Sequence, residues 1–414
     1  MKVYLRTYGC RANQYDTEAI RAMVLASGGE LADNVSDADY AVFNSCTVTA
    51  AAEADLRADV RAASRVNPRL RSVVMGCAAG VPNRDERVAP LSTLPAVDAV
   101  VSGADVRAVA SALGLNPIAL ESGSAQTGAR ALLRIQDGCD EHCTFCATTI
   151  SRGANRSRSI HSVVAEAQRL ADVHPEIVIT GIHIGTYGRD LGETLSSLVA
   201  TLIDTVPAVR FRLSSVEATE VDDRLADLLV SDSTRLAPHL HAPLQSGSDS
   251  LLRRMGRHWY SSESYRRAVE RLNSANPFAL SADVITGFPT ETEEDHRATM
   301  RLIERMPFTS LHVFPYSPRP GSAALKLQPK VPADVARTRA RELRLLADRK
   351  AAVYRTSRIG QEADVVVTEK GKGLTEDYLS VDVADSIPRR SRFRAVLREA
   401  DGRLVALSDS TADD

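Results

Sequence analysis

The 414-residue sequence has no long apolar run, and nothing in it approaches the ~18 consecutive apolar residues of a membrane-spanning helix. Its first residues, MKVYLRTYGC, also lack the tripartite build of a signal peptide. We therefore expect a cytoplasmic protein that does not associate with a membrane. Because thiols stay reduced in the cytoplasm, the six cysteines indicate a metal or catalytic site rather than disulfides.

The sequence also lacks an excess of charge of either sign. Its 51 basic and 53 acidic residues give a formal net charge of −2, so no global positive field favours a nucleic-acid partner. Lysine is scarce, since six lysines among the 51 basic residues leave 45 arginines, and these are spread along the chain. Any prediction of RNA binding must therefore rest on local clusters.

The amino-terminal part repeats one pattern three times. β-Rich runs, each followed by a helix-like or turn segment, end in Cys10 (KVYLRTYGC), Cys46 (ADYAVFNSC) and Cys77 (RSVVMGC). Strands that alternate with helices predict a parallel sheet, whose carboxyl ends share one rim where α/β folds bind ligands. The three cysteines are therefore expected to meet at one place. The alternative is that each is a small buried hydrophobe, as free cysteine often is.

The remaining chain divides into a linker and two further parts. The stretch at 119–128, rich in small and polar residues, reads as a linker, and strand patterns follow at 131–136, 176–180, 209–215, 239–244, 280–286 and 309–314. Six βα units predict an open (β/α)6 partial barrel. After about residue 358 a period-two alternation predicts a small all-β barrel. The expected fold class is α/β, with domains at residues 1–118, 129–350 and 358–410.

GCDEHCTFCATT (138–149) places Cys139, Cys143 and Cys146 in the loop after the first barrel strand. Iron–sulfur clusters are usually held by four cysteine thiolates, so a cluster held by three leaves one iron open to a reactant. A zinc site that uses His142 as its fourth ligand is the alternative, although zinc modules usually show paired C-x2-C steps.

The C-x3-C-x2-C motif, with Phe145 directly before its third cysteine, resembles the radical S-adenosylmethionine superfamily. The resemblance implies that the open iron of a [4Fe–4S] cluster chelates S-adenosyl-L-methionine. Reductive cleavage of the sulfonium then releases a 5′-deoxyadenosyl radical that abstracts hydrogen from the substrate.

Over nearly its full length the chain is similar to the methylthiotransferases of that superfamily, on TYGCRANQYDTEAI, FNSCTVTAAAE, VVMGC and the radical motif. In that family an amino-terminal cysteine trio binds a second [4Fe–4S] cluster, and its ligands carried over by position are Cys10, Cys46 and Cys77. The terminal β unit resembles a TRAM domain, a small RNA-binding barrel.

Among the branches of the family, CTVT, TGIHIGTYGRDL, LHAPLQSGSDSLLRRM and LHVFPYSPRPGS look most like enzymes that modify N6-threonylcarbamoyladenosine at position 37 of tRNA. The implied reaction replaces the C2 hydrogen of that adenine with a methylthio group. Isopentenyladenosine in tRNA and a ribosomal-protein aspartate are the alternative substrates. An RNA-binding iron–sulfur electron carrier or redox sensor is the alternative of another class. The sequence departs from the family pattern at Gly80, Thr149 and Ala218-Thr219.

The motif positions also imply cofactor and RNA contacts. Predicted contacts to S-adenosylmethionine are Phe145, Gly181, Ser214, Ser215, Glu217, Gln245 and Asp283. Predicted RNA contacts are Arg152, Arg156, Arg158, Arg389, Arg390, Arg392, Phe393 and Arg394, in the runs RGANRSR and IPRRSRFR. A solvated basic face explains either run equally well. The expected partners are the tRNA anticodon loop, an electron donor such as a flavodoxin or ferredoxin, and a sulfur source.

Overall fold

A computed structural model of the protein describes residues 1–47, 50–81, 89–115, 126–231, 233–274 and 277–407. The chain forms two compact units. The first contains Met1–Ser124, Gln136–Arg156 and Ser317–Leu327, and the second contains Ala125–Ile135, Ser157–Tyr316 and Gln328–Asp414. Among the described residues, no helix combines the length and apolar character that a membrane crossing requires.

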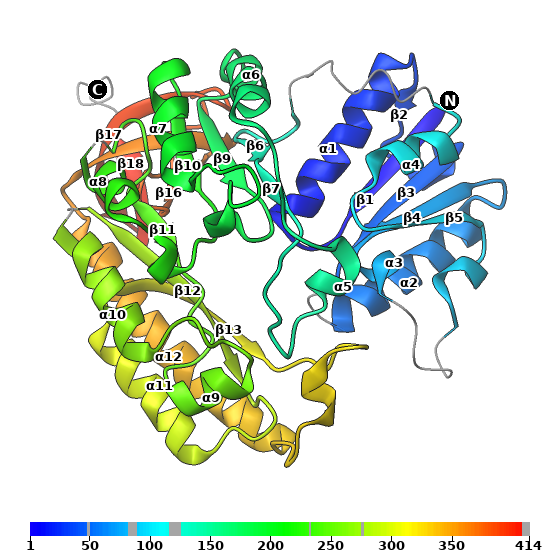
Figure 1. Ribbon diagram of the computed structural model, residues 1–414. Helices are drawn as coiled ribbons and strands as arrows, with labels where there is room; N and C mark the ends of the chain where they lie inside the picture. Colours follow the sequence, from blue (N-terminus) through cyan, green and yellow to red (C-terminus); the bar gives the residue numbers. More distant parts are fainter. Residues whose placement is uncertain (48–49, 82–88, 116–125, 232, 275–276, 408–414) are drawn as a thin grey trace. The chain divides into compact units, whose positions relative to one another are not determined.

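The first unit is built on a five-stranded sheet, all parallel, in the order β2-β1-β3-β4-β5 (Figure 1). Helices α1 and α4 pack on one face of the sheet and α2 on the other, so both faces are covered. This arrangement confirms the predicted parallel α/β fold. The strands are β1 (Lys2–Thr7), β2 (Glu30–Leu31), β3 (Tyr40–Ser45), β4 (Arg71–Gly76) and β5 (Val97–Ser102). The helices are α1 (Arg11–Ala26), α2 (Ala50–Val66), α3 (Cys77–Gly80), α4 (Val106–Ala112) and α5 (Thr148–Arg152).

The second unit contains six parallel strands in two three-stranded sheets, β10-β9-β6 and β11-β12-β13. Isolated parallel bridges join the two sheets, Phe211 to Leu236 and Ser215 to His241. Six strands in this order confirm the predicted partial barrel. They are β6 (Ala131–Arg134), β9 (Glu176–Thr180), β10 (Arg210–Leu213), β11 (His239–His241), β12 (Ala279–Thr286) and β13 (Phe308–Pro315). Short strands β7 (Gln136–Asp137) and β8 (Arg156–Ser157) flank the 138–155 loop in sequence.

Helices cover the outer side of these six strands, because their apolar stripes join the large core around Ile179, Leu213 and Val284. Several begin at strong capping signals. Thr194, Ser261 and Thr292 each form a capping box with the residue three positions later. The helices are α6 (Ile160–Ala171), α7 (Leu195–Thr205), α8 (Asp223–Ser231), α9 (Asp249–Arg254), α10 (Ser262–Glu270) and α11 (Glu293–Arg305).

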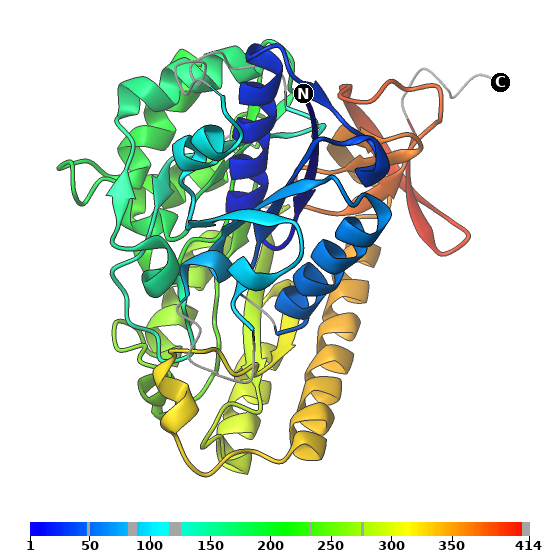
Figure 2. The same ribbon diagram turned by 90° about the vertical axis from the view of Figure 1, so that its right-hand side faces the viewer.

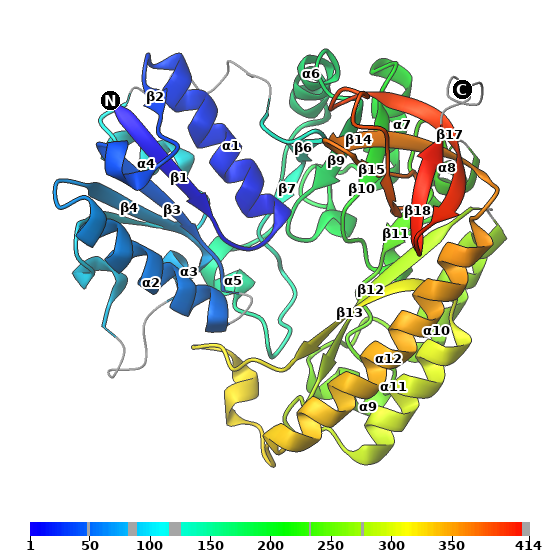
Figure 3. The same cartoon turned by 180° about the vertical axis from the view of Figure 1, so that it is seen from behind.

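The long helix α12 (Ala333–Ser357) leads into a closed five-stranded barrel of order β14-β15-β16-β18-β17, as Figures 2 and 3 show. Its strands are β14 (Glu362–Glu369), β15 (Lys372–Leu374), β16 (Ser380–Asp382), β17 (Arg392–Ala400) and β18 (Arg403–Leu407). Inward-facing Val365, Val367 and Leu397 belong to a separate apolar core. The predicted terminal β-barrel is therefore confirmed.

The predicted domain boundaries at 1–118, 129–350 and 358–410 stay a prediction. Residue 118, residue 410 and most of the predicted linker 119–128 lie outside the described residues. The two compact units follow a different division, since Gln136–Arg156 groups with the amino-terminal sheet rather than with the six strands of the second unit.

Candidate functional site

The three amino-terminal cysteines lie at the carboxyl ends of adjacent parallel strands. Cys46 directly follows β3, Cys77 directly follows β4 and begins α3, and Cys10 precedes α1 in the turn after β1. The Sγ atoms of Cys10 and Cys77 each lie 4.0 Å from Asn13 Oδ1. Gly9 has a φ of +91°, and a Cβ atom there would lie 2.4 Å from Cys46 Sγ. The turn after β1 therefore packs directly against Cys46, and the three thiols share one edge of the sheet.

Asn13 is the centre of the hydrogen bonds around these thiols. It is fully buried, and its Nδ2 donates to the carbonyl oxygens of Tyr8 (2.9 Å) and Ser45 (2.7 Å). Because both donor bonds are made, the amide is held with Oδ1 toward Cys10 and Cys77. The sequence analysis missed Asn13, although it lies within the first turn of α1, three positions after Cys10.

Arg152 was predicted to contact RNA, but its side chain has no exposed surface. Its Nε donates to Cys77 Sγ at 3.3 Å, and its Nη2 donates to Asn13 Oδ1 (2.6 Å) and Asp16 Oδ2 (2.9 Å). Its Nη1 donates to Asp137 Oδ1 at 3.0 Å. Burial alone would lower the pKa of Arg152, but Asp16, Cys77 and Asp137 outweigh it and raise that pKa. Arg152 is therefore a charged partner of a cysteine thiol in this structure, buried away from solvent.

The second cysteine trio lies in a loop whose ends are held together. Cys139 N–H donates to Gly153 O at 3.0 Å, and a Cβ atom on Gly138 would lie 1.9 Å from Ala154 O. Burial raises the pKa of the Cys146 thiol, whereas hydrogen bonds with Thr148 oppose this. The Thr148 N–H donates to Cys146 Sγ at 3.3 Å. All three cysteines of the loop are partly buried.

Two short helices bring the two cysteine groups into the same neighbourhood of the first unit. Cys77 begins α3, and α5 starts two residues after Cys146. A Cβ atom on Gly80 would lie 2.8 Å from Ser151 O, closer than real Cβ atoms come, so α3 and α5 approach backbone to backbone. This close approach explains why glycine stands at position 80, where a glutamine is common in the resembling family.

The donor set of both trios fits iron–sulfur clusters better than single metal ions. A single zinc ion needs ligand atoms that lie close to one another. In the described part of the chain, the group of three metal-ligating side chains whose ligand atoms lie within 4.8 Å of one another contains no cysteine. The thiols of each trio are therefore too far apart for one zinc ion, and a zinc site that uses His142 as its fourth ligand is not favoured. A cubane spreads its cysteine sulfurs farther apart, and thiolates are its ordinary ligands.

Most of the predicted S-adenosylmethionine contacts in the second unit follow the carboxyl ends of its strands, whereas Asp283 lies within β12. Ser215 follows β10 and bridges to His241, and Gln245 N–H donates to Asp283 O at 2.8 Å. Gln245 has a φ of +62°, which is a strained conformation of the kind that collects at functional sites. Gly181 and Ser214 directly follow β9 and β10.

Glu217, which lies in the loop after β10, has a carboxylate oxygen that accepts no hydrogen bond. It is 7% exposed and pairs with Arg257, whose Nε donates to Tyr260 Oη at 2.9 Å. Its second oxygen, Oε2, is buried and has no hydrogen-bond partner. Such an atom requires a donor that the protein does not supply, and an amino group of a bound cofactor would fit it. Phe145, also a predicted contact, belongs to the first unit.

The predicted RNA-contacting residues differ in how free their side chains are. Arg389 donates to Thr127 O (2.6 Å), Arg390 to Gln126 O (2.6 Å), and Arg392 pairs with Asp364. Arg158 pairs with Glu166 and is 30% exposed. Arg156 and Arg394 are 61% and 69% exposed, and Phe393 packs partly against the barrel core.

Comparison with known proteins gives the family. Residues 2–102 match the family described as "Uncharacterized protein family UPF0004", and residues 133–303 match the Radical SAM superfamily. The protein is 34% identical over 401 residues to the threonylcarbamoyladenosine tRNA methylthiotransferase MtaB of Aquifex aeolicus, covering 92% of this chain and 96% of that one. The MtaB of Bacillus subtilis is 34% identical over 93% of this chain and 88% of its own. The chain belongs to the MtaB family of radical S-adenosylmethionine methylthiotransferases.

Solved structures agree with this membership at the level of the fold. The radical S-adenosylmethionine methyltransferase TsrM of Kitasatospora setae superposes with a TM-score of 0.55 at 14% identity, over 76% of this chain and 72% of that one. The MtaB-family enzyme described here is thus a transferase that uses S-adenosyl-L-methionine and two [4Fe–4S] clusters. Its six cysteines are all free thiols, the ligand type that such clusters use.

Proposed function

We propose that the enzyme inserts a methylthio group at C2 of N6-threonylcarbamoyladenosine at position 37 of tRNA. The observation that supports this most is full-length similarity to methylthiotransferases named for that nucleoside, in a chain with two groups of three cysteines. Cys139, Cys143 and Cys146 hold the cluster that reacts with S-adenosylmethionine. Cys10, Cys46 and Cys77 hold the auxiliary cluster.

When bound, the two clusters and S-adenosylmethionine supply electron transfer, the hydrogen-abstracting radical, the methyl group and the site at which sulfur is carried. The chain's own residues position these reagents. Asn13 and Arg152 contact the thiols of the auxiliary trio and fix their orientation. Glu217 Oε2 accepts from the cofactor's amino group, and Gly181, Ser214, Ser215, Gln245 and Asp283 complete that rim. Phe145 contacts S-adenosylmethionine from the loop that carries the radical cluster.

The tRNA anticodon loop contacts the exposed basic residues. The side chains of Arg156 and Arg394 are 61% and 69% exposed, so each binds phosphate, and Phe393 stacks on a base. Arg158, Arg389, Arg390 and Arg392 have protein partners and contribute positive charge. A flavodoxin- or ferredoxin-type donor and a separate sulfur source complete the reaction.

The experiment is anaerobic turnover of the reconstituted enzyme on tRNA, with mass spectrometry of the digested nucleosides. We expect the mass of N6-threonylcarbamoyladenosine to increase by that of a methylthio group less a hydrogen. Modification of isopentenyladenosine instead would replace the proposed substrate. Formation of no 5′-deoxyadenosine at all would favour an electron carrier.

Two variants in the same assay test the assigned clusters. Cys143→Ala is expected to abolish 5′-deoxyadenosine formation. Cys46→Ala is expected to leave that cleavage running and to stop methylthio insertion, because the two trios are separate ligand sets. Equal loss of cleavage in both variants, with the remaining cluster intact by iron analysis and electron paramagnetic resonance, would contradict the division.

A further inference from the structure

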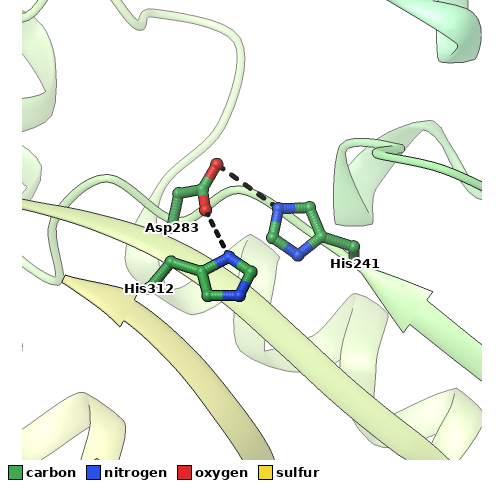
Figure 4. A group of neighbouring side chains, drawn as sticks. All are labelled: His241, Asp283 and His312. Carbon is green, nitrogen blue, oxygen red and sulfur yellow. Dashed lines mark hydrogen bonds and ion pairs between the residues drawn. The ribbon is translucent and has the colours of Figure 1, made fainter. Parts of the chain in front are cut away.

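A group of metal-ligating side chains without any cysteine lies in the second unit. His241, Asp283 and His312 come from strands β11, β12 and β13, and their ligand atoms all lie within 4.8 Å of one another (Figure 4). Asp283 is also a proposed contact to S-adenosylmethionine, but neither histidine takes part in the cluster or cofactor contacts proposed above. The placement of two histidines beside this carboxylate therefore needs a separate explanation.

The sheet itself places these side chains together. Asp283 is the direct register partner of His312 on β13, and His241 is the partner of Ser281, two positions before Asp283 on the same face of β12. The alternate residues of β12, Leu280, Ala282 and Val284, lie in the hydrophobic core. The group therefore projects from the opposite face, on three hydrogen-bonded strands that hold it more rigidly than loops would.

The separations fit a shared ion. His241 Nε2 lies 3.3 Å from Asp283 Oδ2, and His312 Nδ1 lies 3.2 Å from Asp283 Oδ1. Ligands bound at about 2.1 Å from one ion, at tetrahedral or octahedral angles, are separated by about 3.0–3.4 Å. Figure 4 shows one nitrogen of each imidazole ring turned toward the carboxylate, and the ring centroids of His241 and His312 lie 5.4 Å apart.

The surroundings of His241 orient it as a ligand. Its Nδ1 lies 2.9 Å from Ser281 Oγ, which also lies 3.2 Å from His239 Nε2. In the tautomer in which Nδ1 donates to Ser281, the lone pair of Nε2 faces the Asp283 carboxylate, and a cation bound between them would stabilise that arrangement. Metal-binding histidines are commonly fixed in this way through their second nitrogen.

The group is partly open to solvent. The side chains of Asp283 and His312 are 29% and 55% exposed, so an ion here would keep coordination positions open to solvent or to a substrate oxygen. Closed structural sites leave no such positions.

We propose that His241, Asp283 and His312 bind one divalent first-row transition-metal ion, of the series from Fe²⁺ to Zn²⁺. Two imidazoles and one carboxylate are the ligands that these ions favour, whereas Mg²⁺ and Ca²⁺ favour oxygen alone. This inference does not depend on the proposed substrate, because the site is assembled within the second unit and uses no cysteine.

Titration with Co²⁺ tests the proposal. The anaerobically reconstituted holoenzyme is first treated with a chelating resin, and its visible absorption is followed as Co²⁺ is added. We expect one equivalent to bind with the weak ligand-field bands of nitrogen and oxygen ligands. Co²⁺ bound to cysteine would instead show intense sulfur charge-transfer bands, which separates this site from the two trios.

Three variants and a matched control decide the assignment. His241→Asn, Asp283→Asn and His312→Asn should each weaken Co²⁺ binding more than about 100-fold, since loss of even an outer partner costs 10–100-fold. His183→Asn should bind as the parent enzyme does, because His183 pairs with Glu220 at 2.9 Å in the same unit and is not one of the three proposed ligands. If Asp283→Asn does not fold, the His312→Asn variant decides the assignment, because the His312 side chain is half-exposed and its substitution should leave the fold intact. Absence of saturable binding, or unchanged binding in the His312→Asn variant, would overturn the proposal.

Discussion

At the scale of single residues, Arg152 makes the contact with the largest expected effect in the first unit. Its guanidinium and the Asp16 carboxylate are both without exposed surface, and Nε also donates to Cys77 Sγ. Arg152→Gln leaves Asp16 buried beside a neutral amide, so we expect the free energy of unfolding to fall by about 3–5 kcal/mol. A hydrogen bond to a ligand sulfur raises a cluster's potential, so the auxiliary cluster should become harder to reduce. Anaerobic denaturation and potentiometric titration measure the two effects.

Arg156 provides the matched control, because it comes from the same basic run and is 61% exposed. Arg156→Gln should change the free energy of unfolding by no more than about 0.5 kcal/mol and leave the auxiliary potential unchanged. It should instead weaken tRNA binding and reduce the salt dependence of that binding by about one charge. Equal destabilisation by the two substitutions would show that Arg152 has no special role.

The difference between these arginines explains what the sequence could predict at this scale. The six cysteines could be recognised from the sequence. Three of them each follow the end of a predicted strand, and the other three lie within eight residues of one another. RGANRSR, however, contains three arginines that no local pattern distinguishes. Only the tertiary fold buries Arg152 against Asp16 and leaves Arg156 exposed. Asn13 was missed for the same reason, since a polar residue in the first turn of a helix is ordinarily solvated.

At the scale of elements, helix α11 is anchored at its start by Asp295. Its carboxylate accepts from Ser248 Oγ (2.5 Å), Ser250 Oγ (2.7 Å) and Thr292 N (2.9 Å), and it pairs with Arg254. Burial would raise the pKa of Asp295, but these hydrogen bonds hold it well below its usual value. Its contribution to stability is therefore complete above the unfolded pKa of about 3.9 and is lost as the pH falls toward the folded pKa.

Asp295→Asn should therefore destabilise the protein by about 1.5–3 kcal/mol at pH 7, the usual worth of hydrogen bonds to a charged group. The difference between parent and variant should shrink as the pH is lowered from about 5 to below 3, because the parent's carboxylate becomes protonated. Denaturant unfolding at a series of pH values measures this. Glu294→Gln, at a neighbouring exposed position, is the control and should show no such convergence. If the difference in unfolding free energy between parent and variant did not change with pH, the negative charge of Asp295 would not be the source of its contribution to stability.

The elements themselves were largely predictable. The six parallel strands β6 and β9–β13 were all expected within a few residues of their observed bounds. Runs such as EIVIT and LSADVIT are rich in β-branched residues and are separated by amphipathic helices. The grouping of Gln136–Arg156 with the amino-terminal sheet could not be predicted. It depends on long-range contacts such as Arg152 to Asp16, and these leave no periodic signal.

At the scale of the whole molecule, buried charges attach the terminal barrel to the six-stranded part of the second unit. Arg210 donates to Asp364 O at 2.7 Å, and Arg212 donates to Thr375 O at 3.0 Å. Both guanidinium groups are fully buried and share the Glu176 carboxylate. These contacts attach the barrel to β9 and β10. At the same place Arg392 pairs with the Asp364 carboxylate instead of pointing into solvent. A tethered, independently moving RNA-binding module would need none of these contacts.

Glu176→Gln tests this attachment. Two arginines would stay buried with their shared carboxylate removed, so we expect a loss of about 3–5 kcal/mol in the free energy of unfolding. Hydrogen exchange should also rise in β14 and β17, because the guanidinium groups that hold Asp364 and Thr375 lose their orientation. The control is Glu263→Gln, which removes a solvent-exposed partner of Arg266 and should leave the free energy of unfolding close to that of the parent. Barrel exchange that stays unchanged while stability falls would mean that Glu176 stabilises only β9 and β10, and that the barrel is held by other contacts, such as its connection to α12.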